Sequence, residues 1–288
     1  MPTRSETLLL GAVAYAPKVV TIWEGFKEYF IRHGLPFDYI LYSNYETQVE
    51  ALMAGQCDIA WNSPLAWVRA ERLARAQGTQ VRAIAMRDTD CDLTSVIIVR
   101  ADSPITTLAE LKGKVIAVGA IDSPQATLIP FHYLRTEGLT PSIDFEVQRH
   151  DLLGGKHGDH IGGERDGAQS LLAGTADAAC MIKGNYAAWV ADGTLAAGAT
   201  RVLAETPAYD HCNFTVGPVA PPPLVDHFHT LLMAMSYDNP EVRPLMELEG
   251  LKAWRDGRVE GYQPLEAAVD AAHFYDHDGA ITEADYLY

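Results

Sequence analysis

The sequence predicts an α/β protein built from two similar units. Strand-like and helix-like segments alternate from residue 8 onward, a pattern typical of a mostly parallel sheet covered by helices on both faces. The alternation begins again after Ser103-Pro104, and the second series repeats the first in kind. Each series has a Ser-Pro dipeptide directly after a strand, and each has a glycine followed three residues later by the aspartate of an apolar strand.

The first series occupies residues 8 to 100. Val19, Ile22 and Phe26 recur three and four residues apart, so they mark the buried face of a helix that ends at Gly34 and Pro36. The expected strands are 8–14, 37–42, 57–61, 81–86 and 95–100, and the expected helices are 17–33, a short helix before Gly55, and 64–75.

The stretch from Tyr45 to Trp67 reads as helix, tight turn, buried strand and new helix. Gly55 stands where a helix C-terminus favours a residue with positive φ. Asn62-Ser63-Pro64 then supplies a hydroxyl at a helix N-cap and a proline at the first helical position. Such a helix start presents backbone N–H groups at the carboxyl end of the sheet, where open α/β sheets bind their ligands.

The second series has a matching helix start at Asp122-Ser123-Pro124. Its expected elements are a short helical turn at 108–113, strands at 114–119, 145–149 and 177–182, and helices at 122–135, 166–173 and 185–190. The final third is expected to contain helices near 222–236, 240–256 and 264–275, without a further clear series of strands.

Composition excludes some classes of function. The formal net charge of −16 argues against a nucleic-acid partner, because phosphate backbones require clustered Lys and Arg. No apolar run approaches the roughly 20 residues of a membrane-spanning helix. Residues 8–14 are better explained by a first strand than by a signal peptide, so we expect a cytoplasmic protein, or a periplasmic one if a leader was removed. Cys57 and Cys180 lie in apparent buried strands, and we expect no disulfide framework.

One family shares several of these motifs. The run Tyr45-Glu-Thr-x-x-Glu-Ala-Leu-x-x-Gly-x-x-Asp-Ile-Ala-Trp-x-Ser-Pro-Leu-Ala66 resembles the phosphonate-binding, PhnD-like branch of the type 2 periplasmic solute-binding proteins. Thr107-Leu-Ala-Glu-Leu-Lys-Gly-Lys-Val-Ile-Ala117, Ser123-Pro-x-x-Thr127 and Gly174-x-x-Asp-Ala178 are similar to the second lobe of that family. The resemblance covers about residues 8–218.

The resemblance implies two α/β lobes joined by two crossovers, with a ligand cleft between them. Lobe one would contain 1–98 plus 209–288, and lobe two 99–208. It further implies a small-molecule ligand and, if the protein is exported, an ABC permease as partner. We expect no cofactor, although a divalent metal is possible. The family places Tyr15, Tyr45, Ser63, Ser123 and Thr127 around the cleft, and we add Asn62, Asp92, Gln125, His160 and His211 as ligand-binding candidates.

The sequence departs from the family at the second helix start. The family is rich in Ser, Thr and Gly there, whereas this chain has Asp122 before the serine and the bulky Gln125 after it. A carboxylate at the cleft would repel an oxyanion, so these residues count against a simple phosphonate as the ligand.

Two polar segments are candidates for chemistry. The glycine-rich loop from Gly154 to Asp166 contains His157 and His160, which could bind a divalent metal, although a solvated loop explains the same residues. His211 and Cys212 fall where the chain should cross between lobes, and an imidazolium beside a thiol favours the thiolate. Adjacent side chains often point apart, so ordinary packing is the alternative there.

These observations leave three functions open. The leading hypothesis is a solute-binding protein that captures a small polar or anionic molecule, phosphonate-like or related, by closure of the lobes. The alternative is a cytoplasmic enzyme on the same fold, such as a decarboxylase or biosynthetic enzyme of a small aromatic or heterocyclic acid. Its catalytic candidates are His157, His160, His211 and Cys212, with Asp92 or Glu164 as an orienting carboxylate. The third hypothesis is an intracellular sensor domain.

Overall fold

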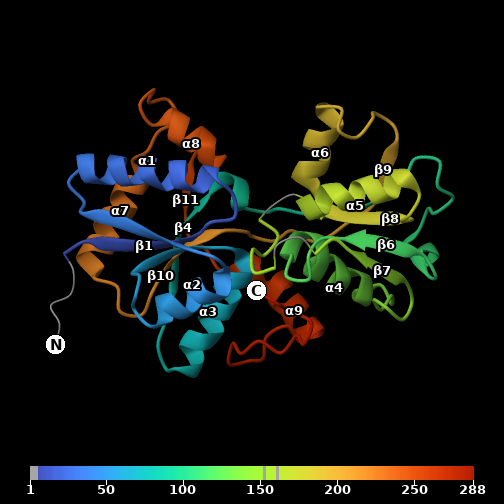
Figure 1. Ribbon diagram of the computed structural model, residues 1–288, viewed down its shortest axis with the longest axis horizontal. Coiled ribbons are helices and arrows are strands. Elements are labelled where there is room, and N and C mark those ends of the chain that lie inside the picture. Colours follow the sequence, from blue (N-terminus) through green and yellow to red (C-terminus); the bar gives the residue numbers. More distant parts are fainter. Residues whose placement is uncertain (1–5, 152–153, 160–161) are drawn as a thin grey trace. The chain divides into compact units, whose positions relative to one another are not determined.

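The computed structural model describes residues 6–151, 154–159 and 162–288 (Figure 1). Contacts divide the chain into two units. Unit 1 contains Met1–Cys91, Asp210–Gly261 and His277–Ala280, and unit 2 contains Asp92–Tyr209, Tyr262–Asp276 and Ile281–Tyr288. Within the described ranges, no helix combines the length and the apolarity needed to cross a bilayer.

Unit 1 is built on a six-stranded sheet with the order β11-β4-β10-β3-β1-β2. Its strands are β1 (Leu8–Val13), β2 (Phe37–Tyr42), β3 (Ile59–Asn62), β4 (Arg82–Arg87), β10 (Asn213–Val216) and β11 (Trp254–Asp256). Its helices are α1 (Lys18–Arg32), α2 (Tyr45–Met53), α3 (Pro64–Ala76), the 3₁₀ turn η1 (Asp88–Asp90), α7 (Pro222–Met233) and α8 (Arg243–Glu249).

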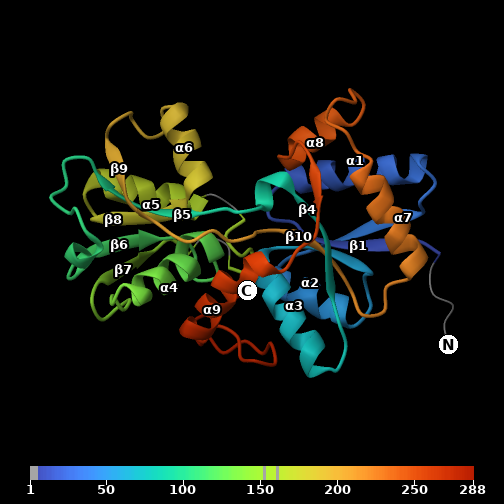
Figure 2. The ribbon, with the colours of Figure 1, turned by 180° about the vertical axis from the view of Figure 1, so that it is seen from behind.

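Helices cover both faces of this sheet (Figures 1 and 2). Apolar residues of α1, α7 and α8 pack on one face in an aromatic-rich core that includes Phe30, Phe214 and Phe228. Helices α2 and α3 cover the other face through residues such as Val49 and Ala66. The predicted helical spacing in α1 is confirmed, because its buried residues are those of the apolar stripe.

Unit 2 is built on a five-stranded sheet with the order β7-β6-β8-β5-β9. Its strands are β5 (Ser95–Arg100), β6 (Val115–Val118), β7 (Glu146–Arg149), β8 (Ala178–Ile182) and β9 (Thr200–Glu205). Its helical elements are η2 (Leu108–Leu111), the π-helical turn η3 (Pro124–Leu128), α4 (Ile129–Thr136), α5 (Gly162–Ala173), α6 (Lys183–Ala191) and α9 (Gln263–Ala272). The turn η4 (Glu260–Tyr262) lies where the chain passes from unit 1 to unit 2, between residues 261 and 262.

Separate cores form on the two faces of the unit 2 sheet. Leu134 of α4 and Leu111 of η2 pack on one face, and Leu171 of α5 and Trp189 of α6 pack on the other. Cys180 lies in this interior and Cys57 in that of unit 1, and burial raises the pKa of both thiols to about 12. Both are therefore inert core residues, as the sequence predicted.

The α/β class and the two sheets are confirmed, and the sheets are mixed. Strands β1, β2 and β3 pair in parallel, as do β6, β7 and β8. Strand β10 pairs antiparallel with β3 and β4, and β5 pairs antiparallel with β8 and β9. Strands β9, β10 and β11 were not expected from the sequence, and the predicted helix 240–256 is in fact the shorter α8 followed by β11.

The division into units differs from the expected lobes. Strand β5 belongs to unit 2, because it pairs with β8 and β9. Residues 92–98, which were expected in lobe one, are therefore part of unit 2. Helix α9 packs against α4 and η3, so residues 262–276 and 281–288 also belong to unit 2. The chain therefore passes between units at 91–92, 209–210 and 261–262, and residues 277–280 return briefly to unit 1.

Candidate functional site

Both predicted helix starts have the expected local structure. The Ser63 hydroxyl accepts a hydrogen bond from the Ala66 backbone N–H at 3.1 Å at the start of α3. The Ser123 hydroxyl accepts one from the Ala126 N–H at 3.2 Å, although the first turn there is the π-helical η3. Both serines are buried. Each unit therefore presents a capped helix start after one of its inner strands.

Near Ser63, the predicted ligand-binding residue Asn62 makes hydrogen bonds within unit 1. The Asn62 side chain accepts from Gln48 Nε2 at 2.8 Å and donates to Thr215 Oγ1 at 2.9 Å, which ties β3 to α2 and β10. Tyr45 opens α2 and is buried, whereas Tyr15 is only partly buried. The roles of these residues in ligand binding stay predictions.

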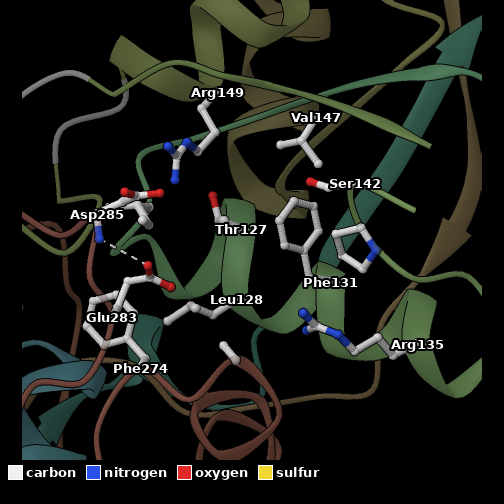
Figure 3. A pocket seen from close by; sticks show the side chains of 13 residues that line it. Thr127, Leu128, Phe131, Arg135, Ser142, Val147, Arg149, Phe274, Glu283 and Asp285 are labelled. Carbon is white, nitrogen blue, oxygen red and sulfur yellow. Dashed lines mark hydrogen bonds between the residues drawn. The ribbon is translucent and has the colours of Figure 1, made fainter. Parts of the chain in front are cut away.

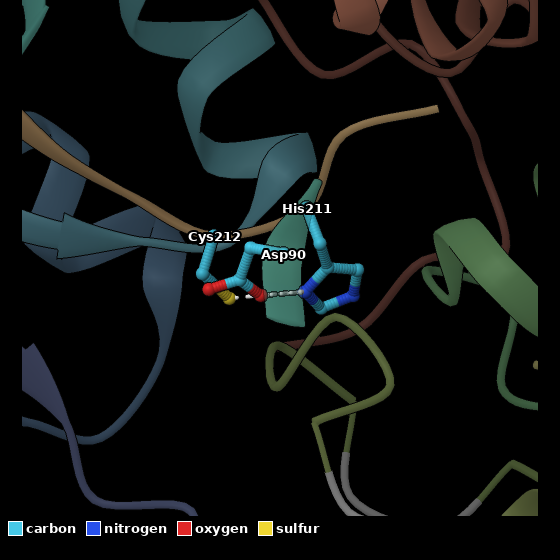
Figure 4. A group of neighbouring side chains, drawn as sticks. All are labelled: Asp90, His211 and Cys212. Atoms are coloured by element: carbon cyan, nitrogen blue, oxygen red, sulfur yellow. Dashed lines mark hydrogen bonds and ion pairs between the residues drawn. The ribbon is translucent and has the colours of Figure 1, made fainter. Parts of the chain in front are cut away.

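The first group of reactive side chains lies at the crossovers of unit 1 (Figure 4). His211 Nδ1 is 3.1 Å from Cys212 Sγ and 3.6 Å from Asp90 Oδ1, and all three residues are buried. The adjacent histidine and cysteine therefore point to the same place. The acidic partner is Asp90, whereas Asp92, the predicted one, belongs to unit 2 and adopts a left-handed φ of 55°.

Two residues that the sequence analysis did not identify control the charge of this group. Arg87 donates to both carboxylate oxygens of Asp90, from Nε at 2.5 Å and Nη2 at 2.9 Å, and Nη1 lies 3.3 Å from Glu249 Oε1. Burial alone would raise the pKa of Asp90, but the Arg87 guanidinium outweighs burial and brings that pKa to about 2. Asp90 is therefore an anion that is already paired.

The geometry of the group does not suit nucleophilic catalysis. In a catalytic triad, the base uses one ring nitrogen toward the nucleophile and the other toward the orienting carboxylate. Here Cys212 and Asp90 both lie next to the same nitrogen, His211 Nδ1. The carboxylate cannot orient the imidazole while the same nitrogen takes a proton from the thiol.

Asp90, His211 and Cys212 are also the described side chains that lie close enough together to hold a metal ion. Arg87 already occupies both oxygens of the carboxylate, and a guanidinium repels a divalent cation. We therefore expect no stoichiometric zinc in protein that is incubated with zinc and then dialysed, measured by elemental analysis. The Arg87→Met variant should take up more zinc, because the competing cation is gone. Stoichiometric zinc in the wild type that disappears in His211→Ala would contradict this expectation.

The second group lies in unit 2 and includes Asp122. This carboxylate is fully buried, and its Oδ2 accepts from the backbone N–H groups of Gly155 at 2.7 Å and His157 at 3.1 Å. Gly158 has a φ of 72°, and a Cβ there would lie only 2.4 Å from Ser123 Oγ. The described loop 154–159 is therefore folded tightly against Asp122 and Ser123.

Gln125 and Glu164 extend this group. Gln125 Nε2 donates to the Gly158 carbonyl at 2.8 Å and to Glu164 Oε1 at 3.1 Å. The other oxygen of Glu164 accepts from the Ile182 N–H at 3.1 Å and Asn185 Nδ2 at 2.9 Å. Glu164 thus connects η3, α5, β8 and α6, which differs from its predicted role as a carboxylate that orients a base.

The predicted histidines of the loop have different outcomes. His157 is fully buried, with its Nε2 3.3 Å from the Tyr286 hydroxyl, and it is not part of the group that could hold a metal. A solvated position for His157 was therefore wrong, because the last residues of the chain cover it. His160 lies outside the described residues. Thr127 lines a pocket within unit 2 together with Phe131 and Val147.

The base of η3 is fixed by residues near the crossovers. The Ser95 hydroxyl donates to the Gln125 carbonyl at 2.5 Å and shares a hydrogen bond with the Tyr209 hydroxyl at 2.8 Å. Burial raises the pKa of Tyr209, so its hydroxyl stays protonated. On the unit 1 side, the His211 N–H donates to the Asp90 carbonyl at 2.8 Å, and on the unit 2 side Leu93 and Tyr209 exchange backbone hydrogen bonds.

The two sheets and these helix starts are the features expected of a two-unit α/β solute-binding protein. The sequence model described as "ABC transporter, phosphonate, periplasmic substrate-binding protein" matches residues 12–268. The chain therefore belongs to this family of periplasmic substrate-binding proteins of ABC transporters, so an ABC permease is its partner. The family is described as periplasmic, which supports that location over the cytoplasmic one expected from the sequence.

Solved structures show the same fold. PhnD1 from Prochlorococcus marinus in complex with methylphosphonate has a TM-score of 0.70 and 16% identity, covering 93% of this chain and 98% of that one. XAC2383 from Xanthomonas citri bound to ATP has a TM-score of 0.72 and 15% identity, covering 93% and 98%. The aliphatic sulphonate binding protein SsuA from Escherichia coli has a TM-score of 0.57 and 17% identity, covering 99% and 94%.

The comparisons do not support the enzyme alternative. The matched family is described as substrate-binding proteins of ABC transporters, PhnD1 is described in complex with methylphosphonate, and SsuA is named as a binding protein. The geometry of His211 gives an independent physical reason, since the shared nitrogen prevents a relay. Members of such a family typically need no cofactor.

Proposed function

We propose that this protein captures a small zwitterionic solute for an ABC importer, and that it does so in the periplasm. The solute would carry an acidic oxyanion and a separate cationic group with N–H donors. The oxyanion is inferred from the molecules named with the relatives, and the N–H donors are inferred from the buried acceptors of this chain. Capture in a cleft between the lobes, as the resemblance implies, is part of this proposal.

Two buried acceptors of unit 2 carry the proposal for the cationic group. Asp122 Oδ1 and Gln125 Oε1 are buried, and neither has a hydrogen-bond partner among the described residues. These atoms belong to the residues on either side of the Ser123-Pro124 helix start. A buried acceptor without a donor costs about 1–3 kcal/mol, so a solute that brings N–H donors gains that energy on binding.

The oxyanion is supported by the helix start of unit 1 and by the relatives. The N-terminus of α3 follows Ser63, and helix N-termini favour negative charge through their free N–H groups. PhnD1 is described in complex with methylphosphonate, and SsuA is named as a binding protein for aliphatic sulphonates. These relatives support a phosphonate or sulfonate as the oxyanion of the solute.

Matched pairs of solutes test the proposal by isothermal titration calorimetry. One pair is ethylphosphonate and 2-aminoethylphosphonate, and the other is ethanesulfonate and taurine. We expect the amino member of at least one pair to bind about tenfold or more tightly than its partner, because it satisfies a buried carboxylate. The protein should first be partly unfolded and dialysed, so that no co-purified solute blocks the site.

Equal or tighter binding of the plain anions would contradict the cationic half of the proposal. If neither pair of solutes binds, and neutral sugars or simple cations bind instead, the oxyanion half of the proposal is contradicted. The two halves therefore fail separately.

A further inference from the structure

Unit 2 contains a pocket of about 350 Å³ that the proposed function does not use (Figure 3). The pocket lies between α4, β7 and the C-terminal segment, and its lining residues all belong to unit 2. Its volume falls within the roughly 300–1,000 Å³ of small-molecule pockets. It is therefore large enough for a small organic ligand.

The middle of the pocket is apolar. Leu128 and Phe131 come from η3 and α4, Val147 comes from β7, and Phe274 follows α9. The Phe131 ring is held against Phe145, with the ring centroids 6.0 Å apart. These fixed walls suit an apolar body and exclude a fully hydrated ion.

At one end of the pocket, one nitrogen of a guanidinium has no acceptor among the described residues. Arg135, in the last turn of α4, has a buried Nη1 with no hydrogen-bond partner in the described part of the chain. Burial also lowers the pKa of Arg135, which reflects the loss of water around the charge. A carboxylate suits such a fork, because it accepts two parallel N–H bonds.

The other end of the pocket is acidic. Glu283 and the exposed Asp285 lie on the far side of Leu128 from Arg135 in Figure 3. Arg149 lies on the same side and its Nε is paired with Asp151 at 3.1 Å, so the carboxylates at this end outnumber the guanidinium. Thr127, which is 3% exposed, points its hydroxyl toward Arg149 and has no hydrogen-bond partner among the described residues.

We propose that this pocket binds a small ω-amino carboxylate, in which an apolar spacer separates the carboxylate from the ammonium. The carboxylate pairs with Arg135, the spacer packs against Leu128 and Phe131, and the ammonium lies between Glu283 and the Thr127 hydroxyl. An α-amino acid fits less well, because its two charges are adjacent while those of the pocket are separated by apolar side chains.

A spacer series tests the proposal on the full-length protein. Glycine, 4-aminobutyrate, 6-aminohexanoate and 4-(aminomethyl)benzoate are titrated, with hexanoate and hexylamine as singly charged controls. Binding is followed through the ¹³C-methyl NMR signals of Ile121, Leu128 and Val147, which line the pocket. We expect one of the longer zwitterions to shift these signals and to bind more tightly than glycine and both singly charged controls.

Variants locate the two charged ends. Arg135→Gln should weaken binding of the preferred zwitterion about tenfold or more, because a buried charge-assisted pair is lost. Glu283→Gln should weaken it by up to about fivefold, since that end is partly exposed. Lys112→Gln is the matched control, because this side chain is 73% exposed and does not line the pocket. Thermal denaturation of Arg135→Gln without ligand should show an unchanged or higher melting temperature.

Three results would overturn the proposal. These are the absence of methyl shifts at millimolar concentrations across the series, equal binding of hexanoate and 6-aminohexanoate, and unchanged affinity in Arg135→Gln. None of them bears on the solute pairs of the proposed function, which are measured separately.

Discussion

Replacing Arg87 with methionine is expected to lower the free energy of unfolding by about 3–5 kcal/mol. Methionine keeps much of the side-chain volume but removes the cation. Asp90 and Glu249 are then left as buried carboxylates, whose side chains are 2% and 4% exposed in the wild type. The contact of the guanidinium with the Trp61 ring, 5.2 Å from the centroid, is also lost. Urea unfolding followed by circular dichroism measures the change.

Two further variants separate lost pairing from lost packing. Arg255→Met is the matched control, because Arg255 is exposed on β11 beside β4, and we expect a change within about 0.5 kcal/mol. The triple variant Arg87→Met, Asp90→Asn, Glu249→Gln also neutralises the two buried carboxylates, so it should recover most of the lost stability. A single variant as stable as the wild type, or a triple variant no better than the single one, would show that the charges are not buried as described.

Asp122→Asn is expected to abolish the preference for amino solutes, while the affinity for plain anions stays the same or rises because the repulsive carboxylate is gone. The amide oxygen can still accept the Gly155 and His157 N–H groups, so loop 154–159 keeps its anchor. The negative charge that would attract the ammonium is gone, so affinity for the preferred zwitterion should fall about tenfold or more. Calorimetry with the same solute pairs gives the ratio directly.

The alanine variant at this position has a different expected result. Asp122→Ala leaves two loop N–H groups without their acceptor, so both members of each pair should bind more weakly. Asp192→Asn is the control, because it makes the same change of charge at an exposed residue after α6. An unchanged ratio of affinities in Asp122→Asn would show that this carboxylate does not recognise the solute.

Local signals allowed much of the fold to be predicted. Proline at the first helical position and serine before it specify a helix start without any distant partner, and both starts are confirmed at Ser63 and Ser123. Gly55 has the positive φ, 68°, that its place after α2 required. These features depend on a few neighbouring residues, so one sequence is sufficient to find them.

Features that depend on distant partners could not be predicted. Strand β10 is a short run whose pairing with β3 and β4 is set by residues more than 100 positions away. Asp90 rather than Asp92 faces His211 because the turn η1 orients it toward Arg87, and no spacing rule distinguishes two aspartates separated by one residue. Arg87 itself carries a usable signal, since it ends a strand three residues before Asp90.

The return of the C-terminal segment to unit 2 affects how the polypeptide matures. Helix α9 packs on α4, and Tyr286 lies against His157, so unit 2 uses residues from both ends of a span of nearly 200 positions. During synthesis, unit 2 cannot complete its interior before this C-terminal segment has left the ribosome, whereas the core of unit 1 is complete once residue 254 has been made. The folding of unit 2 is therefore completed late in synthesis, because its contacts join residues that are far apart in the sequence.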